Sequence, residues 1–474
     1  MERARRLLEG RVLWNINSTP AGGGVAEMLR FFVAYSRGAG LDVRWAVIAG
    51  NPDFFAVTKR IHNLLHGEPG DGGQLGRREH EIYVAVTREN ADGFFAVVRP
   101  GDIVILHDPQ TAGLVPLLKE HGASVIWRSH VGAETPNERV HAAWEFLREF
   151  VTAADACVFT RHVYAPPWAN PLRTAVIQPS IDAFSPKNQD LEPEVVRAIL
   201  AHVGVIAADD GTGVMPVFTR YDGSPGRVDR RCVVSRSGPP PRADEPVVTQ
   251  VSRWDRLKDP LGVMMGFAEH GVVETGAHLL LAGPSVEGVA DDPEGAVVFE
   301  EVRAAWNALP GEKRARVHLA SLPMDDIDEN AAIVNAIQRH ATVIVQKSIQ
   351  EGFGLTVAEA MWKSRPVVAS DVGGIKDQIE DGRSGVLVSD PHDLRAFGEA
   401  VLGLLMDADR ATAIGARARE RVRKHFLVDR HALQYLALLE NLSNDSGSGL
   451  DGRPGDRGGA RARQEAVGGE QRDR

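Results

Sequence analysis

The feature that most constrains how this 474-residue chain can fold is a double series of short apolar runs separated by helical patterns. The first series reads RVLWNINS, LDVRWAVIAG, DIVILHD, ASVIWRSHV, DACVFT and TAVIQPS. The second reads PVVTQVSRW, HLLLAGPS, RVHLASLP, TVIVQKS and RPVVASDVGG. Apolar strands that alternate with helices form parallel sheets. The sequence therefore predicts an α/β protein with two successive Rossmann-like domains.

Between the two series the periodicity is lost, and glycine, proline and arginine accumulate from Pro186 to Pro246. This composition is typical of a linker with a surface insertion, partly disordered. A helical stretch near RHALQYLALLENL follows the second series, and a polar tail without apolar period follows that helix. We expect an N-terminal domain at residues 1–200, the linker and insertion at 201–245, a C-terminal domain at 246–430, a helix at 431–443 that can pack back on the N-terminal domain, and a disordered tail at 444–474.

Composition and charge restrict the compartment and the partners. The 64 acidic residues outnumber the 54 lysines and arginines and no long basic run occurs, so a nucleic-acid partner is not expected. Cys157 and Cys232 are too few for a disulfide framework and lack the paired spacing of a zinc site, which favours a reducing cytoplasm. Glu9 and Arg11 interrupt the first apolar run before a signal sequence could form, and no apolar stretch reaches 18 residues. We therefore expect a cytoplasmic protein without a membrane span that acts on small molecules.

The segment EGFGLTVAE, from Glu351 to Glu359, follows an apolar strand and opens a helix. A helix N-terminus presents unpaired N–H groups and a positive dipole, so it can hold a diphosphate while Gly352 and Gly354 allow close approach. The flanking carboxylates can accept hydrogen bonds from sugar hydroxyls. A simpler interpretation stays open from these residues alone, namely that Thr356 and Glu359 form a capping box that only starts the helix.

The two acids and their context, QKSIQEGFGLTVAEAMWKSRPVVASDVGGIKDQI, resemble the Glu-x7-Glu motif of retaining glycosyltransferases with two facing Rossmann-like domains. The resemblance implies the GT-B architecture, in which an interdomain cleft holds a nucleotide sugar. It also implies that Glu351 contacts hydroxyls of the transferred sugar and that Glu359 holds the nucleotide ribose. The residues expected to bring backbone amides to the phosphates are Gly352, Phe353, Gly354, Leu355 and Thr356.

A cationic pair, Arg253 and Lys258 in SRWDRLKDP, follows the first strand of the C-terminal domain. By itself the pair fits a solvated basic turn. The resemblance implies that the two cations neutralise the diphosphate, whose negative charge grows as the nucleotide leaves. Because the pair and the acid-flanked loop share one domain, we expect the C-terminal domain to bind the donor.

The N-terminal domain carries a second glycine-rich loop. It follows the strand that ends near Asn17 and contains Gly22, Gly23 and Gly24. A nicotinamide cofactor is disfavoured, because Glu27 stands where that fingerprint needs Gly or Ala and no acid ends the next strand. We expect this loop to let a sugar or phosphate approach the backbone in the cleft.

Two polar clusters follow apolar strands of the same domain, His107 with Asp108 and Arg128 with His130. Parallel strands present ligands at their carboxyl ends, so both clusters are expected to face the cleft on the acceptor side. A lone histidine at a strand end is more often structural. The resemblance implies that His130 lies beside the transferred sugar.

A narrower resemblance comes from NSTPAGGGVAEML, FFAVTKRIHNLLHG, HDPQ, RSHVG and QPSIDAFSPKN, which are similar to the trehalose glycosyltransferring synthases. The similarity spans residues 11–188 and 246–442. It implies reversible transfer of glucose from UDP-, ADP- or GDP-glucose to free glucose, which gives α,α-trehalose. The insertion near residues 206–244, the tail, and WDRL beside the two cations depart from the family pattern.

The expected chemistry is a substitution from the face of the leaving group. No carboxylate pair dedicated to double displacement is evident, so the departing β-phosphate is expected to deprotonate the acceptor hydroxyl. The expected catalytic residues are His130, Glu351, Arg253 and Lys258.

No metal and no cofactor beyond the nucleotide sugar are expected. Asp326 and Asp328 resemble a metal-binding Asp-x-Asp, but they precede a helix whose dipole they would complement. The alternatives are a trehalose phosphorylase, in which phosphate replaces the nucleotide, and a glucosyltransferase with another acceptor. A non-catalytic sugar-nucleotide sensor is disfavoured by the retained polar residues. The nucleotide base and the oligomeric state stay open, with a homodimer as one option.

Overall fold

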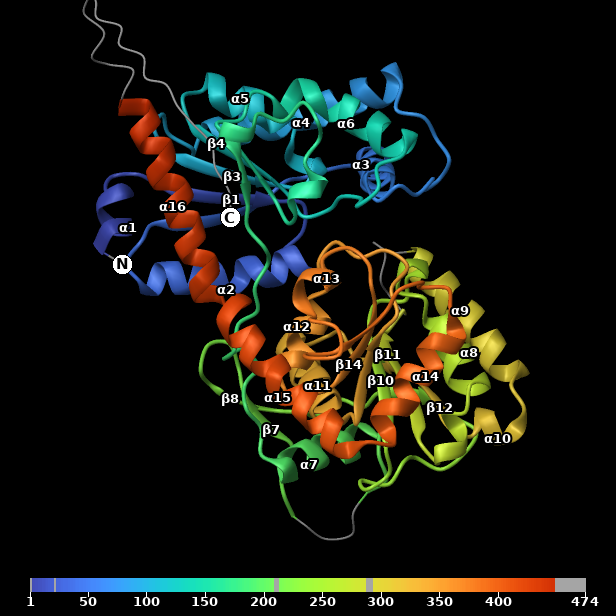
Figure 1. Ribbon diagram of the computed structural model, residues 1–474. Helices are drawn as coiled ribbons and strands as arrows, with labels where there is room; N and C mark the ends of the chain where they lie inside the picture. Colours follow the sequence, from blue (N-terminus) through green and yellow to red (C-terminus); the bar gives the residue numbers. More distant parts are fainter. Residues whose placement is uncertain (1, 21–22, 209–212, 287–292, 448–474) are drawn as a thin grey trace, which may run out of the picture.

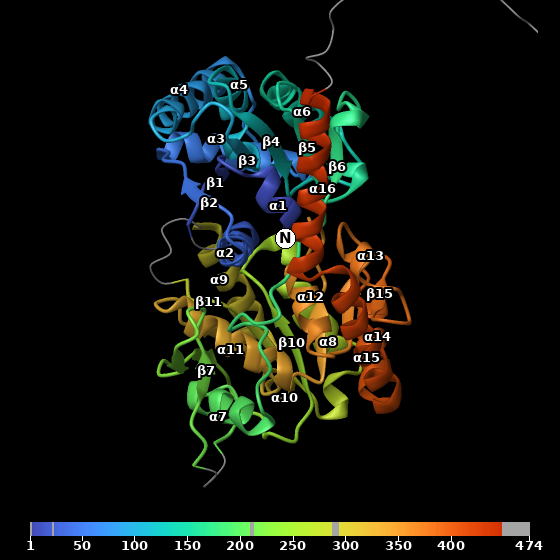
Figure 2. The ribbon, with the colours of Figure 1, turned by 90° about the vertical axis from the view of Figure 1, so that its left-hand side faces the viewer.

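The protein consists of two α/β units stacked one above the other, with a long C-terminal helix that runs along both (Figures 1 and 2). This arrangement is seen in a computed structural model, which describes residues 2–20, 23–208, 213–286 and 293–447. Each unit has a parallel sheet between layers of helices, which is the predicted Rossmann-like architecture. No helix of the described ranges is long and apolar enough to span a membrane.

The N-terminal sheet has six parallel strands in the order β2-β1-β3-β4-β5-β6. Strands β1, β3 and β4 are almost entirely buried, because both faces of a parallel sheet are covered by helices. The chain leaves β1 toward β2 on one side and returns to β3 on the other, so a crevice opens at their carboxyl ends. The strands are β1 Leu13–Asn17, β2 Val43–Val47, β3 Ile103–His107, β4 Ser124–Ser129, β5 Ala156–Phe159 and β6 Thr174–Val176.

Two apolar layers cover this sheet, one on each face. One contains Trp14, Trp127 and Trp144, and the other contains Phe31 and Phe32 of the helix after β1. The helices are α1 Glu2–Leu7, α2 Gly24–Gly38, α3 Pro52–Leu65, α4 Arg77–Phe95, α5 Leu114–Glu120 and α6 Glu138–Val151. Single 3-10 turns lie at Pro109–Thr111, His162–Tyr164 and Pro171–Arg173.

The C-terminal sheet has the order β15-β14-β13-β10-β11-β12-β9, and its second crevice opens between β10 and β13. All its pairs are parallel except the one between β12 and the edge strand β9. The strands are β9 Val233–Ser235, β10 Val247–Val251, β11 His278–Pro284, β12 Val317–Leu322, β13 Val343–Gln346, β14 Val367–Ser370 and β15 Val386–Val388. The helices are α8 Pro260–Glu269, α9 Pro293–Ala308, α10 Gly311–Arg314, α11 Ile327–His340, α12 Leu355–Trp362, α13 Ile375–Gln378, α14 Leu394–Leu405 and α15 Ala408–His425, with 3-10 turns at Arg256–Lys258 and Val273–Thr275.

The segment between the two sheets holds more secondary structure than its composition predicts. It forms helix α7 (Pro193–Val203), the hairpin strands β7 (Val217–Thr219) and β8 (Pro225–Arg227), and the edge strand β9. Helix α7 packs on α11 because its apolar residues recur with helical period, which the surrounding glycine and proline obscure in the sequence. Residues 209–212 of the predicted insertion and residues 448–474 of the predicted tail lie outside the described residues, whereas residues 444–447, which were predicted to be disordered, belong to a helix.

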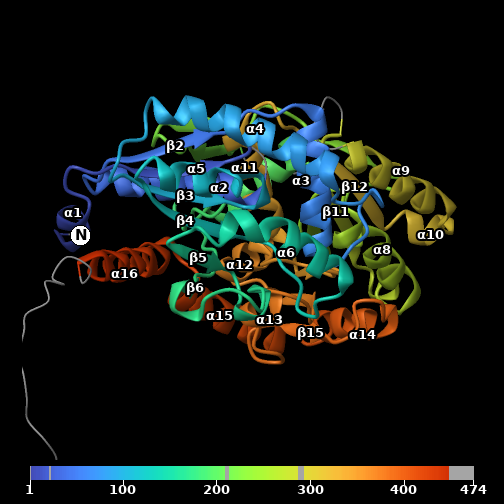
Figure 3. The same ribbon diagram turned by 90° about the horizontal axis from the view of Figure 1, so that it is seen from above.

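Helix α16 (Val428–Gly447) crosses from the C-terminal unit to the N-terminal sheet, as Figure 2 shows, and in the view from above it lies beside α1 (Figure 3). Arg128, at the end of β4, is fully buried and donates hydrogen bonds to Tyr435 Oη (2.6 Å) and His431 Nε2 (2.9 Å) of this helix. Burial and the Arg128 charge lower the pKa of His431 well below its usual value, so His431 is a neutral acceptor. Arg128 was expected to face the cleft. In the structure its side chain points to α16 instead. Alternate residues of a strand lie on the same face of the sheet, and Arg128 shares with Ile126 the face that α16 covers.

We predict that Tyr435→Phe lowers the free energy of unfolding by about 2 kcal/mol, since it removes a buried hydrogen bond to a charged group. Arg3→Met, which removes the exposed Arg3–Glu440 pair of the same helix, should cost less than about 0.5 kcal/mol. Urea denaturation of both variants measures the difference. Equal effects would show that Arg128 does not anchor the helix.

Candidate active site

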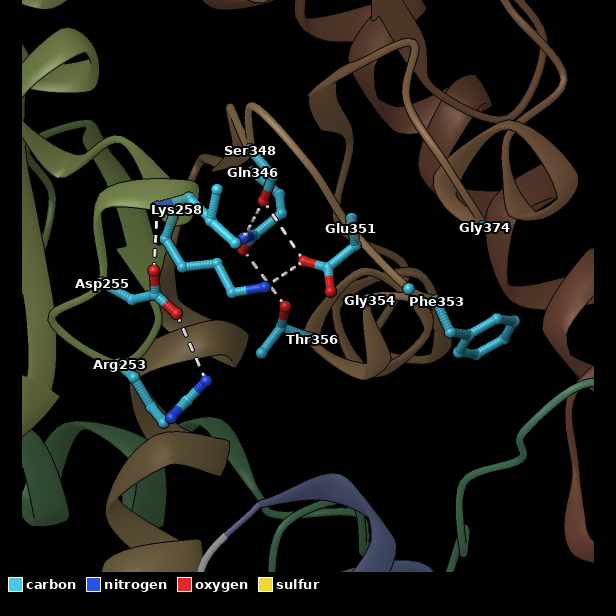
Figure 4. Close-up of polar contacts among 12 residues, drawn as sticks. Arg253, Asp255, Lys258, Gln346, Ser348, Glu351, Phe353, Gly354, Thr356 and Gly374 are labelled. Atoms are coloured by element: carbon cyan, nitrogen blue, oxygen red, sulfur yellow. Dashed lines mark hydrogen bonds and ion pairs between the residues drawn. The ribbon is translucent and has the colours of Figure 1, made fainter. Parts of the chain in front are cut away.

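The predicted donor residues converge at the carboxyl ends of β10 and β13, at the crevice of the C-terminal sheet (Figure 4). Glu351 accepts hydrogen bonds from Lys258 Nζ (2.5 Å) and from Ser348 Oγ (3.2 Å). The side chains of Lys258 and Glu351 are only 17% and 11% exposed, so this ion pair is largely shielded from water. The structure thus brings together a cation and a carboxylate that lie 93 residues apart in the sequence.

The second predicted cation, Arg253, lies on the same loop. Its Nη2 is 3.3 Å from Asp255 Oδ2, and half of its side chain is exposed. Asp255 also caps the 3-10 turn that carries Lys258 by accepting a hydrogen bond from Leu257 N. The loop is therefore shaped by Asp255, while both cations stay at the crevice.

The start of α12 lies beside this pair. Gly354 has a left-handed backbone (φ +86°) and stands at the N-cap, which places Thr356 inside the first turn. The Thr356 hydroxyl bonds Gln346 Oε1 (3.1 Å), so the capping box that the sequence left open is not formed. The Phe353 side chain packs in the core against Phe426, and only its backbone belongs to the loop. The first turn can therefore offer its amides to an anion.

The loop of Glu351 lies against the N-terminal unit. A side chain at Gly352 would come within 2.9 Å of the His130 carbonyl oxygen, and one at Gly373 (φ +52°) within 1.7 Å of the Glu351 carbonyl oxygen. Tyr164 Oη donates to the carbonyl oxygens of Glu351 (3.3 Å) and Gly352 (3.2 Å). Close backbone approach thus explains these glycines and sets His130 next to the donor loop.

On the opposite side of the cleft, His107 and His130 form a stacked pair, with His107 Nδ1 3.1 Å from His130 Nε2. His107 Nε2 lies 3.2 Å from Asn15 Oδ1, and Asp108 Oδ1 accepts a hydrogen bond from His130 N (2.7 Å). Burial and the Arg128 charge lower the pKa of both histidines well below the usual value, and burial raises the pKa of Asp108 to about 7. The histidines are therefore neutral, and Asn15 fixes their orientation. The sequence reading missed Asn15, although a buried asparagine inside an apolar strand is an available signal.

The glycine-rich loop of the N-terminal unit contacts the start of helix α12 in the C-terminal unit. Gly23 caps α2 with φ +83°, and a side chain at Gly24 would come within 2.8 Å of Leu355 Cδ1 at the start of α12. Asn17 is buried and bonds the Thr19 carbonyl oxygen and Trp45 Nε1, so it stabilises the loop. Gly22 lies outside the described residues.

Glu359 of α12 is buried where the two units meet. Its carboxylate is 1% exposed and lies 3.4 Å from Lys187 Nζ and 3.3 Å from Gln338 Nε2. Lys187, in the linker between the units, also pairs with Glu27 of α2 at 2.6 Å. The two carboxylates raise the pKa of Lys187 despite its burial, so it is a cation that bridges two helices of different units. Sequence reasoning missed this lysine because its partners are distant in the chain.

Asp326 and Asp328 belong to the start of α11. Asp326 is its N-cap and accepts hydrogen bonds from Asp328 N (3.0 Å) and Glu329 N (3.1 Å), while it pairs with Arg220. Within the described ranges, no group of three or more His, Cys, Asp or Glu side chains is arranged to hold a metal ion.

The fold is shared with a solved α,α-trehalose-phosphate synthase (UDP-forming) from Burkholderia xenovorans. That structure was determined in complex with glucose-6-phosphate; it superposes with a TM-score of 0.66 at 15% identity over 91% of this chain and all of the other. Two Rossmann-like units with facing crevices and this likeness define the GT-B fold.

Sequence comparison narrows the class. The family model "Trehalose synthase, N-terminal domain" matches residues 15–166, and "Glycosyl transferases group 1" matches residues 300–407. The chain is 36% identical to a trehalose synthase of Pyrococcus horikoshii over 93% of its length and 92% of that protein, and equally identical to one of Rubrobacter xylanophilus. A trehalose phosphorylase of Pleurotus pulmonarius is 27% identical over 86% of this chain and 54% of the phosphorylase. The chain belongs to the trehalose synthase family of glycosyltransferases.

We predict that Lys187→Met lowers the free energy of unfolding by about 3 kcal/mol, because it leaves the buried Glu359 and the partly buried Glu27 without their cation. Adding Glu27→Gln to this variant should recover part of the loss. The control Lys424→Met, at an exposed pair with Glu420, should change stability by less than about 0.5 kcal/mol. Thermal or urea unfolding compares the three variants, and a loss no larger than that of the control would argue against a bridging role.

Proposed function

We propose that the protein is a retaining glucosyltransferase that moves glucose reversibly from a nucleoside-diphosphate-glucose to free glucose and forms α,α-trehalose. The observation that carries this proposal is the Lys258–Glu351 pair at the crevice between β10 and β13, directly beside the start of α12. Such a donor offers a leaving phosphate, a transferred sugar and a diphosphate. The cation suits the leaving phosphate, the carboxylate suits the hydroxyls of the sugar, and the amides at the start of the helix suit the diphosphate.

The diphosphate would bind to Arg253, Lys258 and the amides from Gly352 to Thr356. Positive groups at this place gain strength in the transition state, because the departing nucleotide becomes more negative. Asp255 and Glu351 hold the two cations at the crevice before substrate enters, and the phosphate then takes the place of Glu351 at Lys258. The binding of phosphate therefore requires no metal in this proposal.

The reaction breaks the bond between the anomeric carbon and the β-phosphate oxygen and forms a bond to the acceptor hydroxyl oxygen on the same face. The acceptor proton passes to the departing β-phosphate oxygen. Glu351 orients the transferred glucose, and the neutral His130, oriented by His107, hydrogen bonds the same sugar. The chain's own groups thus position substrates and stabilise charge without forming a covalent intermediate.

In this proposal the C-terminal unit binds the nucleotide ribose and the N-terminal unit binds the acceptor. Glu359 would bind the ribose by sharing its carboxylate with Lys187, which already occupies one of its oxygens. The acceptor glucose would lie against the N-terminal unit, near Gly23, Gly24 and the His107–Asp108 turn. The Arg128 side chain would not contact the acceptor, because it is fully buried against α16 and acts on His107 and His130 only through its charge.

A reducing, cytoplasmic setting accords with the two cysteines. Cys157 and Cys232 are both unpaired, and burial raises the pKa of each thiol to about 12. Thiols with such a pKa are protonated and unreactive near neutral pH. We place the enzyme in the cytoplasm, with a homodimer as the oligomer to test.

Product analysis tests the function. The protein is incubated with UDP-, ADP- or GDP-glucose, with and without free glucose, and with glucose 1-phosphate as the competing donor. Trehalose formed only from a nucleotide donor plus free glucose is the expected result. Trehalose formed only from glucose 1-phosphate would identify a phosphorylase instead.

We predict that Glu351→Gln and Glu359→Gln separate catalysis from binding. Glu351 lies where positive charge grows on the transferred glucose, so its variant should lose on the order of 10²-fold in kcat. Glu359→Gln should mainly raise the Kd of free nucleoside diphosphate and the donor KM, because a ribose contact is the same in ground and transition states. Titration and initial rates measure both, and the reverse pattern would exchange the two roles.

Nucleoside diphosphate is expected to bind equally well with and without a chelator, because Arg253 and Lys258 supply the counter-charges. Lys258→Gln should weaken this binding by roughly 10-fold or more, as loss of a charge-assisted contact does. Calorimetric titration with EDTA or added Mg²⁺ measures the first effect. Loss of binding in EDTA would overturn the assignment of the two cations.

A further inference from the structure

Tyr164 lies between the two loops that carry the proposed sugar-binding residues. It is the last residue of the 3-10 turn after β5 in the N-terminal unit, and it is only 2% exposed. A side chain at Gly132, shortly after His130, would come within 2.4 Å of Tyr164 Cγ, so the aromatic ring supports the loop of His130. The Tyr164 hydroxyl reaches the loop of Glu351 in the C-terminal unit. One side chain thus contacts both loops.

The hydroxyl acts on the backbone that carries the Glu351 carboxylate. Its single proton is shared between the carbonyl oxygens of Glu351 (3.3 Å) and Gly352 (3.2 Å), as in a three-centre hydrogen bond. Burial raises the pKa of Tyr164 to about 12, so the hydroxyl stays a donor near neutral pH. From the C-terminal unit, the Gly374 amide donates to the same Glu351 oxygen (3.3 Å). The Glu351 peptide group is therefore held from both units, and its position depends on how the units meet.

The rest of the loop is held differently. The buried Gln378 side chain donates hydrogen bonds to the carbonyl oxygens of Phe353 and Gly354. The Thr356 hydroxyl bonds Gln346. All these residues belong to the C-terminal unit. Most of the segment that is proposed to bind the diphosphate is therefore fixed within one unit, whereas the peptide group that carries the carboxylate is fixed across the cleft.

We propose that Tyr164 is a positioning residue that sets the Glu351 carboxylate against the transferred sugar when the two units meet. This inference rests on the proposed function. Before substrate enters, Lys258 also holds this carboxylate (2.5 Å). In the donor complex the phosphate takes that cation, so the carboxylate then depends on Ser348 and on its own backbone. Tyr164 therefore acts on the step in which positive charge grows on the sugar, and little on the binding of the nucleotide.

Tyr164→Phe tests the proposal, because it removes the hydroxyl and keeps the ring that supports the His130 loop. We expect kcat to fall roughly 10-fold, with the donor KM and the Kd of nucleoside diphosphate changed less than about threefold. Tyr35→Phe is the matched control, since the Tyr35 hydroxyl donates to Asp182 (2.8 Å) between α2 and the linker, outside the proposed site. This control should leave kcat unchanged. A wild-type kcat in Tyr164→Phe would overturn the proposal.

A double-mutant cycle shows whether Tyr164 acts through Glu351. In the Glu351→Gln background the carboxylate is already absent, so adding Tyr164→Phe should lower kcat by less than about twofold more. A full second loss in the double variant would show that the hydroxyl acts independently of the carboxylate, and the proposed role would be wrong.

Hydrogen–deuterium exchange provides a measurement that needs no substrate. Loss of the hydrogen bond between the units should speed exchange in the peptides around Glu351 and Gly374 of Tyr164→Phe, while α12 and the control variant keep the wild-type pattern. If the wild-type protein uses no nucleotide sugar, the proposed function fails while exchange still tests the position of the loop. Unchanged exchange in both peptides would contradict the inference whichever donor is used. Faster exchange throughout the N-terminal unit would show a general structural role instead.

Discussion

The structure depends most on one ion pair, between Lys258 after β10 and Glu351 after β13. The two strands are neighbours in a parallel sheet, so their carboxyl ends meet at one edge and bring these residues together. Because the pair is largely shielded from water, neither charge is stable without the other. Glu351 is thus held beside the proposed position of the leaving phosphate at Lys258. The loop that begins at Glu351 leads directly into helix α12.

The pair is useful only if the N-terminal unit stays opposite it, and two cations with little or no exposure to water hold the units together. Lys187 joins Glu27 of α2 to Glu359 of α12, and Arg128 fastens α16 to the end of β4. Any opening of the cleft between α2 and α12 must lengthen one arm of the Lys187 bridge. Ribose binding at Glu359 and the position of the N-terminal unit are therefore linked, because both depend on the contact between Lys187 and the Glu359 carboxylate.

The sequence predicted both sheets, because apolar runs and helical periods are local signals, and it predicted the donor loop, because its residues are contiguous. It did not predict where side chains point. Arg128 turns to α16 rather than to the cleft, and Thr356 bonds Gln346 instead of capping its helix. The sequence also did not predict the roles of Asn15 and Lys187, because these roles come from partners on other strands or on the other unit. The order within residues 193–235 was hidden by glycine and proline between short amphipathic pieces.

The most direct test of the account is a crystal structure of the protein with a bound nucleoside diphosphate. The account predicts that the β-phosphate lies within roughly 3 Å of Lys258 Nζ and of amides in the first turn of α12, with Glu351 released toward the sugar position. A diphosphate bound instead at the Gly23–Gly24 loop of the N-terminal unit, with the Lys258–Glu351 pair unchanged, would contradict the placement of the donor site.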